Sequence, residues 1–117
     1  MASHLEERFK LNWRAVSGPE LKREFQFHPS RRWRADFAHL ESMTLIEVEG
    51  GIWSKGRHSR GKGFEQDCEK YLEAVLLGFK VIRLTEKQLD AATLDRVARH
   101  LERYVKSESD LLDLLEE

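Results

Sequence analysis

The spacing of apolar residues along the chain predicts three helices and four strands. Apolar side chains recur at every third or fourth position in the helical segments, which are residues 4–16, 64–78 and 87–105. They alternate with polar ones, or form short β-branched runs, in the strand segments, which are residues 23–28, 33–40, 44–49 and 80–85. The order helix, three strands, helix, strand, helix predicts an α/β fold with a mixed central sheet flanked by helices.

The first three strands are expected to form an antiparallel meander. Only a short polar turn separates 33–40 from 44–49, so these two segments predict a hairpin. Residues 23–28 add a third strand, which Pro29 ends. The strand at 80–85 is expected to rejoin the sheet after the second helix.

Turn-forming and capping residues mark the helix ends. The sequence "SGP" at 17–19 ends the first helix, and Gly78 stands where a C-terminal cap of the second belongs. Thr85 and Gln88 have the spacing of a capping box for the last helix. We expect the apolar face of the second helix to be buried; it consists of Phe64, Cys68, Tyr71, Leu72, Val75 and Leu76.

Two acidic residues are expected to meet on one face of the hairpin. The side chains predicted to face the core are Trp33, Ala35, Phe37, Ile46 and Val48. Asp36 and Glu47 then emerge together on the opposite face, at a cross-strand separation of about 5 Å between Cβ atoms. Like charges that close are unfavourable unless a proton or a cation such as Mg²⁺ lies between them. The alternative is a plain solvated strand face, but the adjoining Gly50-Gly51 pair and basic loop favour a site.

Length and charge predict one domain followed by an acidic tail. We assign residues 1–107 of the 117 to the domain and 108–117 to the tail, which has five acids and no Lys or Arg. The remainder has 20 basic and 16 acidic residues, a balance that suits a polyanion partner. We expect no membrane span and no signal peptide, because no apolar stretch is long enough and the N-terminus is charged. The single cysteine favours a reducing, intracellular setting.

A basic, glycine-rich loop is predicted before the second helix. Residues 51–63, "GIWSKGRHSRGKG", include Lys55, Arg57, Arg60 and Lys62 and no acid, which suits phosphate. His58 in this loop has an intrinsic pKa suited to a general base or a metal ligand; the alternative is a solvent-exposed histidine. Asp67 follows in the first helical turn, where a negative charge is also favoured by the helix dipole alone.

The order of these acids and glycines resembles the PD-(D/E)XK nuclease superfamily, whose fold is called restriction-endonuclease-like. Asp36 and the run Glu47-Val48-Glu49 stand as its acid and its acid-x-acid. A more specific resemblance is to the branch of very-short-patch repair endonucleases and related small phage and bacterial endonucleases. The matching pieces, over residues 4–85, are Glu6 or Glu7, "ADF" 35–37, "IEVEGG" 46–51, His58, Asp67 and "GFKVIR" 78–83.

This resemblance implies a DNA endonuclease that depends on Mg²⁺, with Mn²⁺ as a substitute, in the cytoplasm of a bacterial or phage-infected cell. It implies that Asp36, Glu47 and the carbonyl of Val48 hold the metal. It also implies that Glu6, His58 and Asp67 complete the site. The residues expected to contact the DNA backbone are Lys55, Arg57, Arg60, Lys62 and Lys70.

The chain departs from the superfamily at one position. The lysine expected two residues after the second acid is replaced by Glu49. The group that activates water is therefore open between Glu49, His58 and Lys70, and we favour His58 acting with a metal-bound water.

Other functions fit the same sequence. A DNA-binding or assembly protein could keep this fold without the chemistry, and RNA could replace DNA as the substrate. A homodimer would suit double-strand cutting, because two-fold symmetry matches antiparallel strands. The acidic tail contains four leucines among its charges and would suit docking to a protein partner.

Overall fold

The computed structural model describes residues 4–50 and 60–116, with the backbone alone described at residue 60 and beyond residue 103. These residues form a mixed α/β structure, as predicted. In chain order the elements are α1 (His4–Ala15), β1 (Lys22–Gln26), β2 (Arg34–His39), β3 (Thr44–Glu49), α2 (Arg60–Leu76), β4 (Lys80–Thr85), the short 3-10 helix η2 (Glu86–Gln88) and α3 (Ala91–Glu116). Within the described residues, no helix is both long and apolar enough to cross a membrane.

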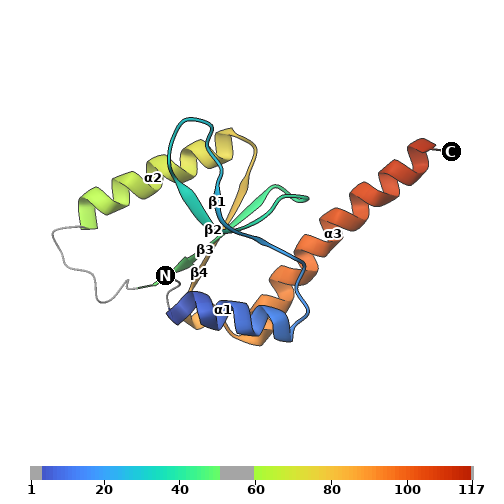
Figure 1. Ribbon diagram of the computed structural model, residues 1–117, viewed down its shortest axis with the longest axis horizontal. Helices are drawn as coiled ribbons and strands as arrows, with labels where there is room; N and C mark the ends of the chain where they lie inside the picture. Colours follow the sequence, from blue (N-terminus) through green and yellow to red (C-terminus); the bar gives the residue numbers. More distant parts are fainter. Residues whose placement is uncertain (1–3, 51–59, 117) are drawn as a thin grey trace.

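The strands form one mixed sheet in the order β1-β2-β3-β4. The first three strands are antiparallel, which confirms the predicted meander. β4 runs parallel to β3 and pairs with it from Thr44 opposite Lys80 to Glu49 opposite Thr85. The connection between these two strands includes α2, as parallel pairs require a long crossover. Figure 1 shows α2 on one side of the sheet and α1 with the first part of α3 on the other.

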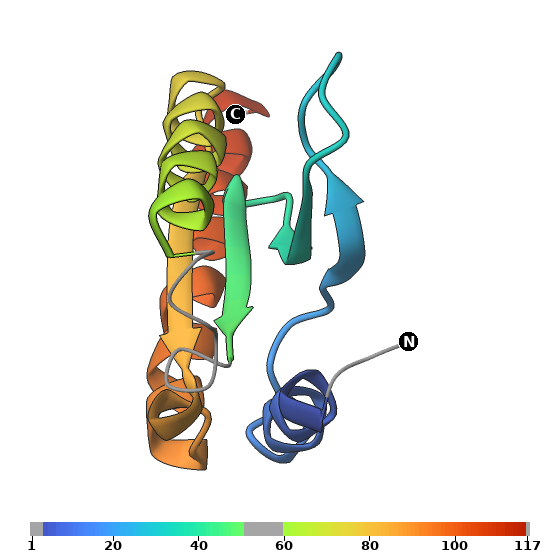
Figure 2. The same cartoon turned by 90° about the vertical axis from the view of Figure 1, so that its left-hand side faces the viewer.

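Both faces of the sheet are covered by apolar side chains. On the α1 and α3 side, the buried cluster consists of Phe9, Trp13, Phe37, Ile46, Leu84, Leu89, Leu94, Ala98 and Leu101. On the α2 side, a second cluster consists of Phe27, Ala35, Ala38, Leu45, Ala74 and Phe79. The view in Figure 2 shows the helices packed along the sheet, with β4 as the edge strand nearest α2. Helices cover both faces of the sheet at β3. This explains why the first half of β3 has apolar side chains on both faces.

One predicted strand face is wrong. Trp33 and Ala35 pack in the α2-side cluster, whereas Phe37 packs in the other. The alternation is interrupted at Asp36, because β2 pairs with β3 only from Phe37 to His39. Glu24, on the neighbouring strand β1, has a backbone φ of 47° in the left-handed region. The side chains on the two sides of Asp36 therefore turn to different faces of the sheet.

The second helix differs from its prediction in extent and in orientation. It begins at Arg60 rather than residue 64, so Arg60 and Lys62 lie in its first turn and not in a loop. Gly78 follows its end with a φ of 98°, which confirms the glycine cap. The prediction that the apolar face is buried is wrong: Phe64, Cys68, Leu72, Val75 and Leu76 are exposed. Ala74 is instead the buried residue, and the partly buried positions beside it are polar or aromatic.

The last helix begins later and ends later than predicted. The capping box is confirmed, with Gln88 Oε1 accepting the Thr85 backbone N–H at 3.0 Å, but it opens η2. Asp90 caps α3 instead, because its Oδ2 accepts the Thr93 backbone N–H at 3.1 Å. The backbone of α3 continues to Glu116, so the segment 108–116 extends this helix beyond the sheet (Figure 1).

Candidate active site

The interruption of β2 places a carboxylate on the backbone of β3. Asp36 Oδ2 accepts a hydrogen bond from the Val48 N–H at 2.7 Å. This bond occupies the position where the β2–β3 ladder would otherwise continue, since the last ladder pair is Phe37 with Ile46. The carboxylate of Asp36 is thereby held beside β3, close enough that its charge acts on Glu47. Asp36 and Glu47 therefore interact through their charges, although the β2–β3 ladder ends one pair before the position at which they would lie directly opposite each other.

Glu47 is a buried carboxylate that forms an ion pair with Lys70. Its side chain is only 8% exposed, and its Oε1 lies 2.9 Å from Lys70 Nζ of α2. Burial raises the pKa of Glu47 from 4.5 to about 7, and the negative charges of Asp36 and Glu49 add to this effect, while Lys70 opposes it. At neutral pH, Glu47 is therefore divided between its protonated and its ionised form. The ionised form needs a positive charge close to it.

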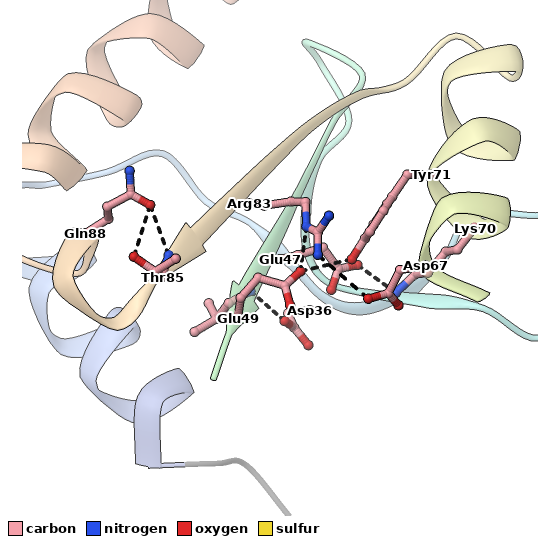
Figure 3. A network of polar contacts seen from close by, with 10 residues as sticks. Asp36, Glu47, Glu49, Asp67, Lys70, Tyr71, Arg83, Thr85 and Gln88 are labelled. Carbon is pink, nitrogen blue, oxygen red and sulfur yellow. Dashed lines mark hydrogen bonds and ion pairs between the residues drawn. The ribbon is translucent and has the colours of Figure 1, made fainter. Parts of the chain in front are cut away.

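Glu49 is held from two elements. Its Oε1 accepts hydrogen bonds from Arg83 Nε at 2.8 Å and from the Tyr71 hydroxyl at 3.1 Å. The Arg83 guanidinium also stacks on Tyr71, with Cζ 4.5 Å from the ring centroid. Figure 3 shows Glu47, Glu49 and Arg83 projecting from β3 and β4 toward Lys70, Tyr71 and Asp67 of α2. The polar side of α2 thus faces the sheet because β3 and β4 present charged residues there.

Arg83 also belongs to this network, and the network changes its pKa. Its Nη2 lies 3.7 Å from Asp67 Oδ2, and Asp67 is half exposed. Burial opposes the charge of Arg83, but the hydrogen bond to Glu49 and the charges of Glu49 and Asp67 together outweigh it and raise the pKa of the guanidinium. Burial and the charges of Glu47 and Glu49 raise the pKa of the Tyr71 hydroxyl as well. Tyr71 is therefore neutral near pH 7 and serves as a hydrogen-bond donor.

The predicted N-terminal acid is Glu6 or Glu7 on α1. The side chain of Glu6 is 16% exposed and that of Glu7 is 58% exposed, and both lie within 4.0 Å of Arg23 on β1. α1 approaches the end of β3 closely, since a Cβ added at Gly50 would lie 2.5 Å from Leu5 Cδ1. This contact brings the start of α1 to the end of β3 that carries the acids, and Glu6 is the more enclosed of the two.

Several predicted site residues either lie outside the described residues or have a different environment from the one predicted. Lys55, Arg57 and His58 lie outside the described residues. The backbone of Arg60 and the exposed side chain of Lys62 belong to the first turn of α2. Lys70, predicted to contact the DNA backbone, is ion-paired with Glu47.

The donors available for a metal ion are oxygens. Among the described residues, no group of three or more His, Cys, Asp or Glu side chains is arranged to hold a metal. Two carboxylates, Asp36 and Glu47, act on each other electrostatically, and the β3 backbone at Val48 lies beside them. Mg²⁺ is commonly held by one or two carboxylates and completes its shell with water, so this donor set fits it.

An open groove with basic walls was not foreseen from the sequence. It has a volume of about 660 Å³ and lies between β4 and α3. Its lining includes Arg83, Arg96, Arg99, His100 and Arg103. Arg99 is occupied by ion pairs within α3, whereas Arg96 and Arg103 are exposed and no carboxylate of the described residues pairs with them. The sequence did contain one indication of this groove: Arg96 and Arg103 are seven residues apart, so they lie on the same side of one helix.

Comparison with known proteins gives one structural likeness. The catalytic domain of the homing endonuclease I-Bth0305I has a solved structure that matches with a TM-score of 0.55 and 20% sequence identity. The match covers 91% of this chain and 97% of that domain, so the two share a fold over nearly their whole length. No family model and no curated protein matches the sequence.

Proposed function

We propose that the protein is a metal-dependent DNA endonuclease with its active site at Asp36 and Glu47. The observation that carries this proposal is the buried carboxylate of Glu47, whose pKa is raised to about 7 by burial and by two neighbouring acids. Such acid clusters are unfavourable for stability and are characteristic of sites that bind cations. The nuclease-like fold supports the assignment, because the similar solved domain belongs to a homing endonuclease.

A divalent cation is the natural complement of this site. Asp36, Glu47 and the Val48 carbonyl would hold it, with Mg²⁺ as the physiological ion and Mn²⁺ as a substitute. When bound, the ion would polarise the phosphate and lower the pKa of a coordinated water. Its charge would also lower the pKa of Glu47, since an adjacent cation favours the ionised carboxylate.

The protein's own residues would align these carboxylates and neutralise charge. The Val48 N–H orients Asp36, and Lys70 places an ammonium against Glu47. We propose that Lys70 supplies the positive charge that the superfamily places two residues after the second acid, where this chain has Glu49. That ammonium is positioned to stabilise negative charge developing on a phosphate bound at the carboxylates.

The remaining site residues are assigned supporting roles. Glu49, which is held by Arg83 and Tyr71, would keep β3, β4 and α2 in register beneath the substrate. Asp67 would help to orient Arg83, and Glu6 would close the site from α1. His58 remains our proposed acceptor of the proton from water.

Backbone phosphates would be contacted by cations around the site. The predicted contacts Lys55, Arg57, Arg60 and Lys62 precede or begin α2, and we add Arg96 and Arg103 from the groove beside β4. Such contacts position a duplex without reading its sequence. A duplex held along the edge strand β4 would pass next to Arg83, which connects the groove with the carboxylates.

Plasmid cleavage tests the proposal. We expect the purified protein to nick or linearise plasmid DNA with Mg²⁺ or Mn²⁺ and to be inactive in EDTA. Asp36→Asn and Glu47→Gln should each lower the rate at least about 100-fold, as the loss of a group that acts in the transition state does. Glu69→Gln, an exposed acid on α2, is the matched control. Full activity in Glu47→Gln would sink the assignment, and matched DNA and RNA duplexes would distinguish the two substrates.

A DNA-binding or assembly protein without catalytic activity is the second candidate. It is favoured by the 2.9 Å ion pair, because Lys70 already places a positive charge on Glu47. In that case the protein would bind duplex DNA with no cleavage at any divalent ion concentration, and Glu47→Gln would bind as well as the unchanged protein.

A further inference from the structure

Arg83 of β4 belongs to two features of the molecule at once. It pairs with Glu49 and Asp67 beside the candidate active site, and it also lines the basic groove between β4 and α3. In the parallel register of β3 and β4 it lies opposite Glu47, and neighbouring strands are about 4.8 Å apart. Arg83 therefore lies at the junction between the carboxylates and the groove.

The guanidinium of Arg83 is held in a fixed orientation. Its Nε donates to Glu49 Oε1 at 2.8 Å, and its Cζ lies over the ring of Tyr71, 4.5 Å from the centroid. The Tyr71 hydroxyl donates to the same oxygen of Glu49 at 3.1 Å, so the two residues that hold Arg83 also hold each other. Figure 3 shows these side chains converging between β3, β4 and α2. An arginine that is already fixed loses little side-chain entropy when it binds a ligand.

Most of the hydrogen-bonding capacity of this guanidinium is unused. An arginine side chain has five N–H bonds, and within the part of the chain that the structure describes only the Nε–H of Arg83 donates a hydrogen bond. Asp67 Oδ2 lies 3.7 Å from Nη2, which is close enough for an ion pair but too far for a hydrogen bond. The side chain is 48% exposed. The two Nη groups are therefore available to an acceptor that enters from solvent.

The groove indicates which acceptor fits. Its lining adds Arg96, Arg99 and Arg103 from α3 to Arg83, and the acidic Asp95 in that lining pairs with Arg99 at 3.5 Å. The groove is therefore complementary to an anion. Phosphate oxygens match the paired N–H groups of a guanidinium, and the successive phosphates of a nucleic-acid strand would extend from Arg83 along the α3 side of the groove.

We propose that Arg83 binds a backbone phosphate of the substrate through its Nη groups, at the point where a DNA strand passes from the carboxylates into the groove. The identity of this strand as DNA rests on the proposed function. The phosphate bound by Arg83 is the neighbour of the one held at Asp36 and Glu47, so the contact would keep the strand in place for cleavage. Glu49 and Tyr71 are then positioning residues, because they orient the guanidinium.

Binding of duplex DNA in EDTA tests this contact without cleavage. Arg83→Met removes the charge and keeps much of the side-chain volume. We expect it to weaken binding by about 10-fold, and to reduce the slope of log affinity against log salt by about 0.9, the value for one lost phosphate contact. Arg14→Met removes an exposed charge of α1 outside the groove and should leave the slope unchanged.

Two further variants separate a phosphate contact from a purely structural role. Glu49→Gln breaks the same ion pair but keeps the guanidinium, so it should lower the melting temperature and leave the salt slope unchanged. Arg83→Lys keeps a point charge but loses the planar group, so it should keep the slope and bind more weakly than the unchanged protein.

The salt slope decides between the two roles. An Arg83→Met protein that melts at a lower temperature but keeps the slope of the unchanged protein would show that Arg83 is structural only, and would overturn the inference. An equal loss of slope in Arg14→Met would overturn it as well, because the effect would then not belong to the groove.

Cleavage distinguishes this inference from the proposed function. A protein whose salt slope depends on Arg83, but which cleaves DNA with no divalent ion, would refute the proposed function and leave the phosphate contact standing. Metal-dependent cleavage together with a slope that Arg83→Met does not change would do the reverse. A protein that binds no duplex DNA would refute both.

Discussion

Lys70 of α2 and Glu47 of β3 form an ion pair of 2.9 Å between side chains that are only 16% and 8% exposed. The two residues are far apart in the chain and meet because α2 crosses from β3 to β4 over this face of the sheet. Glu49, two residues further along β3, is bound to Arg83. Positive charge thus reaches Glu47 from the helix and not from its own strand.

Removing this ammonium should destabilise the protein in a pH-dependent way. Lys70→Met leaves Glu47 buried without its cation, and Glu47 then takes up a proton instead. Because the pKa of Glu47 is about 7 in the unchanged protein, we expect the free energy of unfolding to fall by about 1.5 kcal/mol at pH 8. The loss should be much smaller at pH 5, where Glu47 of the folded protein is protonated. Urea unfolding in EDTA at the two pH values measures both effects.

A second lysine provides the control for that experiment. Lys10 pairs with Glu7 at 3.6 Å on α1, and both side chains are at least a third exposed. Lys10→Met should cost less than about 1 kcal/mol at either pH, as exposed ion pairs do. Equal losses for the two substitutions would show that Lys70 does not stabilise a buried carboxylate.

Glu47 itself should make stability fall as the pH rises toward neutrality. Its pKa is about 7 in the folded protein and 4.5 as its ordinary value. Between these values the folded state retains the proton longer than the unfolded state, so its contribution is full below pH 4.5 and is lost by pH 7. Glu47→Gln removes this titration.

The measurable quantity is the difference between the two proteins. In EDTA, the stability of Glu47→Gln relative to the unchanged protein should increase from pH 5 to pH 8, by no more than about 3 kcal/mol. Unfolding curves at several pH values would give this difference. A difference that is constant across the range would contradict the raised pKa.

Two glycine substitutions should have opposite effects on stability. A Cβ added at Gly18 would collide with the indole of Trp13, which is buried and donates from Nε1 to the Pro19 carbonyl at 2.8 Å. Gly18→Ala should therefore destabilise the protein by about 3 kcal/mol. Gly63→Ala meets no atom within 4 Å and lies inside α2, where it should stabilise by about 1 kcal/mol. Thermal unfolding of both variants tests the contrast.

The basic groove should contribute to DNA affinity through phosphates. In EDTA with the Glu47→Gln protein, so that no cleavage intervenes, Arg96→Ala and Arg103→Ala should each weaken duplex binding. Each should also reduce the slope of log affinity against log salt by about 0.9. Arg14→Ala, at an exposed position of α1 outside this groove, should leave the slope unchanged. Unaltered slopes in both groove variants would exclude the groove as a DNA contact.

The strands were the most predictable part of the fold. β3 and β4 have the bounds that alternation and β-branched residues predicted, because a period of two is a property of the strand backbone. The break at Asp36 was not predictable in this way. It depends on a hydrogen bond from the Asp36 carboxylate to the backbone of Val48, a contact between strands that neither strand's pattern contains.

The orientation of α2 shows a second limit. The sequence shows that one side of the helix is apolar, but not whether the sheet or another surface covers it. Glu49 and Arg83 on the sheet bind Tyr71, and this polar network turns the apolar side outward. The influence of the Asp36 charge on Glu47 is consistent with strand alternation, whereas the cation on Glu47 required the crossing of α2. The metal ligands and the roles of Glu6 and His58 stay predictions.

The parallel pairing of β3 with β4 sets when the site can form during folding. Glu47 lies opposite Arg83 in that register, and the whole crossover separates the two strands in the chain. The hairpin of β2 and β3 closes a short loop, whereas the parallel pair must close a long one at greater cost in chain entropy. We therefore expect the site to be among the last parts of the fold to assemble. A nascent chain that ends before Lys80 carries Asp36, Glu47 and Glu49 but lacks the strand that aligns them.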